Sequence, residues 1–174
     1  RLGSRPWFAA ATQAVTADSA ASREMKRPRG GMIRSLYQDG PADRAGMAVG
    51  DVVVAIDGQN VASPKALNFR LGTRMIGKSA RIDVWRDGAN KRLTLNLVPA
   101  PETPPRKITQ LSGRQPLAGA TVANLSPALA EELGLDTLNS GVIILKVDPR
   151  GLARRFRFRK GDVVLGVNKA RINL

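Results

Sequence analysis

Apolar residues gather in short runs that are separated by glycine, proline and charged positions. Residues 8–15 are small and mostly apolar, residues 32–38 form a second run, and residues 52–56 read Val-Val-Val-Ala-Ile without a polar position. An uninterrupted apolar run of this length is expected of a strand that is covered on both faces. We therefore predict strands in all three segments.

Residues 80–98 show a different pattern, in which apolar and polar positions alternate. Ile82 and Val84 share one face of the first half, and three leucines alternate with polar residues in the second half. Asp87-Gly88 lies between the halves, and this dipeptide favours a tight turn. The segment is predicted to be an antiparallel hairpin with one buried face.

Helix signals occur at four places. Ser63-Pro64 is the strongest, because serine caps the first turn and proline gives up an N–H group that has no partner there anyway. This helix is predicted over residues 63–71. Weaker signals predict a helix over residues 17–26, a short helix ending at Gly46 and another ending at Gly134.

The pattern occurs twice along the chain. The sequence Gly-Asp-Val-Val stands at residues 50–53 and again at 161–164, and Pro6 corresponds to Pro116. A spacing of about 110 residues indicates tandem globular domains rather than a solenoid. Strands are accordingly predicted over residues 118–125 and 141–147.

These features divide the chain into a first domain (residues 1–98), a linker (99–109) and a second domain (110–174). The linker holds four prolines, which stiffen it toward an extended polyproline conformation. The second domain has no counterpart of the helix at residue 63 or of the hairpin. Its core is expected to be incomplete unless further residues or a neighbour supply the rest. The predicted class is α+β, mainly β.

The amino-acid composition limits which metal sites, disulfides and catalytic groups the chain can have. Hydrophobic residues make up 43% of the chain, which is enough for a core, but the sequence contains neither cysteine nor histidine. This excludes disulfides, thiolate metal sites and the usual serine triad. We expect no metal, no cofactor and no catalysis by this chain alone. No run of about 18 apolar residues predicts a membrane span, no signal peptide is visible, and a start at Arg1 suggests a fragment.

The charge is strongly positive, since 28 lysines and arginines face 14 acidic residues, giving +14. Such an excess attracts polyanions, but solvated surface charge is the simpler explanation. One cluster lacks acidic residues altogether, and it consists of Arg150, Arg154, Arg155, Arg157, Arg159 and Lys160. It is either a solvated face or a contact for acidic protein segments, a neighbouring subunit or an anionic membrane surface. Phe156 and Phe158 are expected to anchor it in the core. Nothing beyond these two rings supports nucleic acid as a partner.

Three motifs in residues 40–58 resemble those of PDZ domains. They are Gly-Pro-Ala-x-x-Ala-Gly, Gly-Asp-Val-Val and Ile-Asp-Gly. The order of elements resembles the circularly permuted bacterial form, in which a carboxylate-binding loop opens the domain. The resemblance implies a small, partly open β-barrel or sandwich with two helices, used twice here, with the second copy truncated.

The tandem arrangement resembles the C-terminal half of the HtrA/Deg (Do-like) periplasmic serine proteases. Residues 114–120 and 126–134 are similar to the second PDZ domain of that family. The protease domain is absent from this sequence, which lacks histidine and the Gly-Asn-Ser-Gly-Gly motif.

The resemblance also implies a peptide groove. It assigns Phe8, Ala9 and Ala10 to the carboxylate loop, Ala11, Thr12 and Gln13 to the strand that pairs with the peptide, and Asn68 and Leu71 to the facing side of the helix. Leu67 is expected in the core. In the second domain the loop is assigned to Leu117, Ala118, Gly119 and Ala120. Ala9 stands where the family usually has glycine, and a positive φ there would cost about 1 kcal/mol.

By resemblance, this chain is the regulatory region of a periplasmic serine endoprotease. It would capture extended or C-terminal hydrophobic segments of misfolded proteins by strand addition, couple their binding to the protease domain and help to hold a homo-oligomer together. The alternatives are an assembly module that binds no carboxylate, and a polyanion-binding surface.

Overall fold

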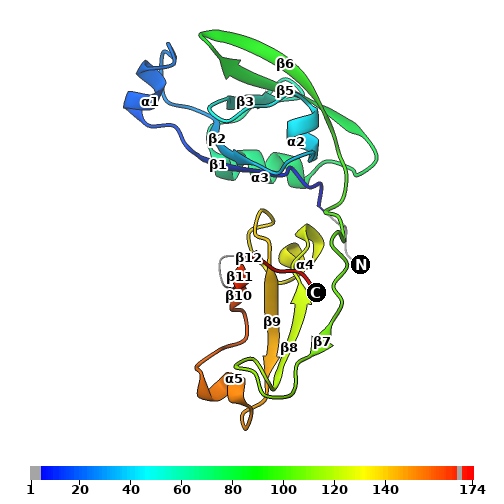
Figure 1. The fold of residues 1–174 in the computed structure, drawn as a ribbon. Coiled ribbons are helices and arrows are strands. Elements are labelled where there is room, and N and C mark those ends of the chain that lie inside the picture. The colour runs from blue at the N-terminus through cyan, green and yellow to red at the C-terminus, as the bar shows by residue number, and fades with distance from the viewer. Residues whose placement is uncertain (1–4, 168–169) are drawn as a thin grey trace. The chain divides into compact units, whose positions relative to one another are not determined.

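A computed structural model describes residues 5–167 and 170–174. The chain forms two compact units, Arg1–Pro99 and Ala100–Leu174 (Figure 1). Each unit is built around an antiparallel sheet with a few short helices, as predicted. In the part of the chain that the structure describes, no helix is long and apolar enough to cross a membrane.

The first unit holds one open sheet. Its elements are β1 (Ala10–Ala14), α1 (Ala17–Ala21), β2 (Gly31–Leu36), α2 (Pro41–Arg44), β3 (Val52–Ile56), β4 (Gln59–Asn60), α3 (Pro64–Gly72), β5 (Ser79–Arg86) and β6 (Ala89–Asn96). The strands run in the order β1-β2-β3-β5-β6, with β4 paired to β3. The sheet therefore begins at β1 and ends at β6, and it does not close into a barrel.

The core of the first unit follows the predicted pattern. Every residue of β3 is buried, and Ile82, Val84 and Leu95 pack against it from the hairpin. The α3 helix begins at the Ser63 cap, whose hydroxyl accepts a hydrogen bond from Ala66 N. It contributes Leu67 and Leu71 to the same core. This packing fixes α3 beside β1 and β2.

The Gly-Asp steps belong to the scaffold. Asp51 is buried, accepts a hydrogen bond from Ala48 N at 2.9 Å and receives two more from the Arg86 guanidinium. The Asp51 carboxylate raises the pKa of Arg86 above its ordinary value. In the repeat, Asp162 accepts from Arg159 N at 2.8 Å. Both carboxylates therefore hold the turn that precedes a strand.

The second unit repeats part of this arrangement. Its elements are β7 (Thr109–Gln110), β8 (Ala120–Asn124), α4 (Pro127–Glu132), β9 (Val142–Val147), α5 (Leu152–Arg155), β10 (Val163–Val164), β11 (Gly166–Val167) and β12 (Ala170–Arg171). The main sheet runs β10-β9-β8-β7, and β11 pairs with β12. β8 and β9 take the places of β1 and β2, since Ala120 pairs with Val147 as Ala10 pairs with Leu36.

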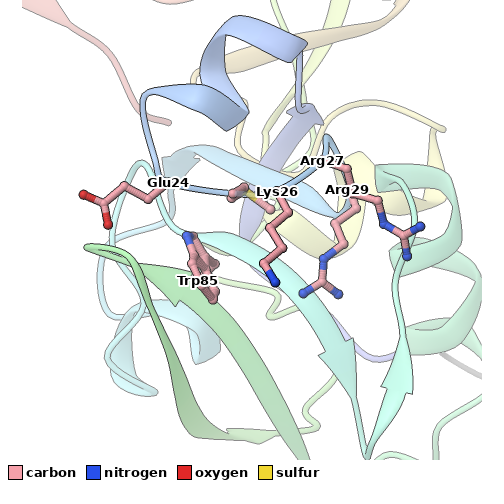
Figure 2. Close-up of a pocket in the computed structure, with 6 residues that line it drawn as sticks. Glu24, Lys26, Arg27, Arg29 and Trp85 are labelled. Carbon is pink, nitrogen blue, oxygen red and sulfur yellow. The ribbon is translucent and has the colours of Figure 1, made fainter.

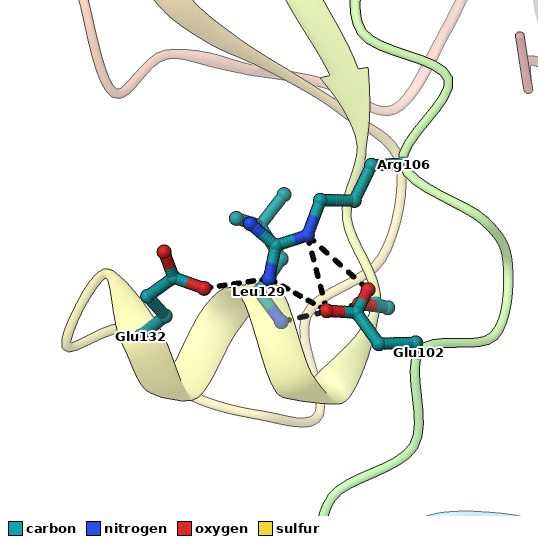
Figure 3. Close-up of polar contacts among 5 residues, drawn as sticks. Glu102, Arg106, Leu129 and Glu132 are labelled. Atoms are coloured by element: carbon teal, nitrogen blue, oxygen red, sulfur yellow. Dashed lines mark hydrogen bonds and ion pairs between the residues drawn. The ribbon is translucent and has the colours of Figure 1, made fainter. Parts of the chain in front are cut away.

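The Pro-rich segment packs on the second unit through Arg106 and Pro105. Arg106 forms ion pairs with Glu102 at 2.6 Å and with Glu132 of α4 at 2.5 Å, as Figure 3 shows. These two carboxylates raise the pKa of Arg106 well above its ordinary value. The buried Asn124 side chain donates to Pro105 O at 2.9 Å. Side chains far along the chain thus hold this segment against the second unit.

Two sequence predictions need correction. The α1 helix ends at Ala21 instead of continuing to residue 26, because its last turn closes with hydrogen bonds to Ala20 O. Phe156 is not a core anchor, since it is 59% exposed, whereas Phe158 does pack on the second core. The short α5 has only one turn, so it cannot bury both rings.

Candidate functional site

A free strand edge is the main feature of the first unit. β1 pairs with β2 on one side only, and α3 lies beside both strands. Backbone groups on the open side of β1 have no strand to pair with, and such an edge is a template for an additional strand. The predicted strand residues Ala11 and Thr12 are half-buried there, and Gln13 is exposed.

The loop that leads into β1 carries unused hydrogen-bond donors. Trp7 N donates to Val98 O at 2.8 Å, and Ala9 O accepts from Tyr37 N at 2.9 Å. Within the described residues, the N–H groups of Phe8 and Ala9 have no acceptor. Adjacent backbone N–H groups without partners form a ready site for an anion such as a carboxylate.

Ala9 adopts the left-handed conformation, with φ of +63°. This is the condition under which alanine in place of glycine carries strain of about 1–2 kcal/mol. The Ala9 side chain is buried and faces Gly40, where an added Cβ atom would lie 2.6 Å from Ala9 Cβ. The loop therefore keeps the geometry of a glycine loop, and Gly40 makes room for the extra methyl group.

The helix residues assigned to the groove divide between surface and core. Asn68 is exposed, while Leu71 is 4% exposed and packs in the core with Phe8 and Leu67. The structure thus brings the predicted loop and helix together through one apolar cluster. Phe69, in contrast, is 71% exposed.

Arg5 lies beside α3, and sequence reasoning did not single it out. Its guanidinium donates to Asn68 O at 3.3 Å and lies over α3 near Gly72, where an added Cβ atom would be 2.8 Å from Arg5 Nη2. The sequence signal that could have pointed to Arg5 is a positively charged residue three positions before Phe8. Its position places a positive charge at the end of the groove helix.

The corresponding loop of the second unit uses its N–H groups internally. Ala118 N donates to Gln115 O, Gly119 N to Leu111 O and Ala120 N to Leu117 O, at 2.9–3.0 Å. The edge of β8 that faces away from β9 is paired with β7. In this structure the loop assigned to residues 117–120 therefore has no free donor among those three for a carboxylate.

The basic cluster lies on the surface of the second unit, as expected for any of its proposed roles. All six cations are exposed, and none of them forms an ion pair within the described residues. Residues 5–167 and 170–174 contain no group of three potential His, Cys, Asp or Glu metal ligands.

A second group of cations rims a pocket in the first unit. Lys26, Arg27 and Arg29 line a volume of about 540 Å³ together with Trp85. In Figure 2, Glu24 points away from the three cations. The Trp85 indole N–H donates to Arg23 O at 2.7 Å, which holds the ring in the wall. No ion pair involves these three cations in the described part of the chain.

Comparison with known proteins defines the class. Residues 17–97 match the PDZ domain family, and this range holds β2, β3, β5 and β6 of the open antiparallel sheet together with α3. This part of the chain is a PDZ domain.

The relatives are more specific. The chain is 30% identical to a DegP-like periplasmic serine endoprotease of Halomonas elongata, over 95% of this chain and 34% of that protein. It is 31% identical to one of Ectopseudomonas mendocina, over 97% of this chain and 36% of the relative. The matches identify a PDZ region of the HtrA/Deg type, and the chain spans about a third of the length of these relatives.

Solved structures agree with this assignment. The HtrA-type protease AlgW, solved with a decapeptide, superposes with a TM-score of 0.51 at 28% identity, over 56% of this chain and 30% of that chain. AlgW was also solved with a tripeptide, and that structure gives a TM-score of 0.50 at 29% identity.

Proposed function

We propose that the first unit captures extended peptide segments and peptide C-termini by strand addition at β1. The observation that carries this proposal is a free strand edge that begins at Phe8 N and Ala9 N, two backbone N–H groups that find no acceptor among residues 5–167 and 170–174. Main-chain pairing supplies affinity, and the groups at the end of the groove select the terminus.

The geometry suggests how a peptide lies. It runs antiparallel to β1, and its carboxylate accepts hydrogen bonds from Phe8 N and Ala9 N. Its last side chain packs on the apolar cluster at Phe8 and Leu71, so an apolar residue is preferred. Arg5 adds favourable charge near that end.

The comparisons extend the proposal to the whole protein. In a protein like the periplasmic serine endoproteases that this chain resembles, the PDZ region catches exposed hydrophobic ends of misfolded envelope proteins and couples their binding to a protease domain. The peptides bound to AlgW support such a role. The catalytic groups lie outside this chain, and the protein works in the periplasm as a homo-oligomer.

Titration calorimetry with the purified chain tests peptide capture. Hexapeptides that end in Val, Leu or Phe should bind with a free carboxylate and lose at least tenfold in affinity when the carboxylate is amidated. Equal binding of the acid and the amide would refute capture of the C-terminus. Binding that moves only amides of the second unit in NMR spectra would refute the assignment to β1.

The exposed cations favour a second candidate role, the binding of acidic protein segments by the basic cluster of residues 150–160. A poly-glutamate probe should bind, and its affinity should fall steeply between 50 and 200 mM salt, since each contact is largely electrostatic. Replacing Arg154, Arg155 and Arg157 by Ser should abolish the interaction. No binding at low salt would end this candidate.

A further inference from the structure

The second unit carries a strand along the same edge that is free in the first unit. β7 pairs antiparallel to β8, with Thr109 opposite Val122 and Gln110 opposite Thr121. β8 is the counterpart of β1, and β9, the counterpart of β2, lies on its other side. The segment of residues 106–111 therefore occupies the position that an added peptide strand would take.

The ends of this segment are also arranged like those of a bound peptide. Leu111, its last residue, lies at the loop before β8. Leu111 N donates to Ala120 O at 2.8 Å, and Leu111 O accepts from Gly119 N at 2.9 Å. Gly119 is the counterpart of Ala9, whose N–H is free in the first unit. The Leu111 side chain packs on the apolar cluster of the second unit.

A turn explains how an internal residue reaches this position. The chain leaves Leu111 through Ser112-Gly113, with Gly113 at φ of +87°. The Gln115 side chain donates to Ser112 O at 2.8 Å, and Ala118 N donates to Gln115 O at 3.0 Å. The chain turns away directly after Leu111. The Leu111 carbonyl can therefore take the place of the carboxylate of a peptide C-terminus, although the chain does not end there.

The other end of the segment is fastened by side chains that the first unit lacks. Asn124 N donates to Arg106 O at 2.7 Å, and the Asn124 side chain donates to Pro105 O. Arg106 is tied to Glu102 and Glu132. The position of Asn124 is taken by Ala14 in the first unit.

From these contacts we propose that residues 106–111 are an internal ligand of the second unit, bound by strand addition, with Leu111 in place of the terminal residue. The segment keeps the β8 edge closed to other strands. An extended peptide with an apolar residue at its end is the chemical class that would compete with it. This inference concerns only the second unit and does not require peptide capture by the first.

Amide hydrogen exchange on the whole chain tests the proposal. In the native chain, Gly119 N–H and Asn124 N–H should exchange at least tenfold more slowly than Phe8 N–H and Ala9 N–H. Leu111→Pro removes the donor to Ala120 O, so exchange at Gly119 and Asn124 should speed up at least tenfold. Leu125 N–H, which donates to Gly141 O, should stay protected and show that the sheet is intact.

A peptide probe completes the test. Acetyl-Arg-Lys-Ile-Thr-Gln-Leu with a free carboxylate should shift the NMR signals of residues 118–124 in Leu111→Pro and leave them unchanged in the native chain. Arg106→Ala, which cuts both ion pairs, is a second variant that should bind the probe more weakly than Leu111→Pro does, and Gln110→Ala is the control that should behave as the native chain. Equal shifts in the native chain, or fast native exchange at Gly119, would overturn the proposal.

Discussion

β1 and β8 are equivalent strands of the two units, and they differ in what lies along one edge. Both pair with the following strand in the same register, and both begin at a residue that follows a left-handed position, Ala9 or Gly119. β1 has an open edge, while β8 has β7 along it. The two units therefore share one strand geometry but differ in whether the edge of that strand is paired.

Few residues make this difference. Asn124 and Arg106 fasten a strand to β8. The first unit has Ala14 at the position of Asn124, and its Phe8 N and Ala9 N have no acceptor in the described part of the chain. At the loop, the first unit combines Ala9 with Gly40, and the second combines Gly119 with Gly151. Substitutions at these positions test the comparison, beginning with the largest expected effect.

Gly119→Ala should destabilise the second unit by about 2–3 kcal/mol. The residue has φ of +90°, which alanine tolerates poorly, and its added Cβ atom would lie 2.9 Å from Gly151 Cα. Exchange of Leu125 N–H under denaturant measures this loss. The matched change, Ala9→Gly, should leave the first unit equally or more stable. If Gly119→Ala lowered the stability of its unit by less than Ala9→Gly lowered that of the first unit, the two loops would not be equivalent.

Gly40→Ala should destabilise the first unit by about 2 kcal/mol, a typical cost of overpacking. Its Cβ atom would meet Ala9 Cβ at 2.6 Å and Tyr37 O at 3.0 Å. Trp7 and Trp85 are the two tryptophans of the chain, and both lie in the first unit, so fluorescence during urea unfolding reports this loss.

The double variant Ala9→Gly/Gly40→Ala controls for the cause of that loss. It should recover at least half of it, because the two methyl groups no longer meet. Additive effects in this cycle would show that the methyl groups do not compete for one space.

Ala14→Pro should weaken binding of a peptide by about tenfold, or 1.4 kcal/mol. The counterpart of Ala14 N, Asn124 N, donates to Arg106 O in the segment that leads into β7, so Ala14 N is expected to face an added strand. Proline on the solvent side of an edge strand leaves the existing ladder intact. Calorimetry measures the affinity, and Gln13→Ala is the control because its exposed side chain leaves the backbone donors in place. Unchanged affinity with an intact fold would move the peptide away from β1.

The buried β3, the hairpin of β5 and β6 and the capped α3 could be read from the sequence because apolar runs, alternation and Ser-Pro caps are local signals. From the sequence, one could say only that a positive φ at Ala9 would carry strain if the loop needed it. The residue that leaves room for the Ala9 methyl group, Gly40, lies 31 positions away. The packing of residues 99–109 could not be foreseen. It depends on Glu132 and Asn124, and no local pattern joins those residues to Arg106.

The smallest expected effect concerns acid sensitivity, which should differ between the units. Arg81 N–H holds the pKa of Asp57 below its ordinary value of 3.8, with Arg74 adding to the effect. A lowered pKa in the folded state means that the carboxylate stabilises the first unit above the unfolded pKa, and this contribution is lost as the pH falls through the folded value. The repeat has Asn168 at this position in the sequence, and asparagine does not titrate. Between pH 5 and pH 3, tryptophan-detected unfolding should therefore shift to lower urea concentration by a larger amount in the native chain than in Asp57→Asn. An equal shift in both proteins would mean that other carboxylates account for the acid sensitivity of the first unit.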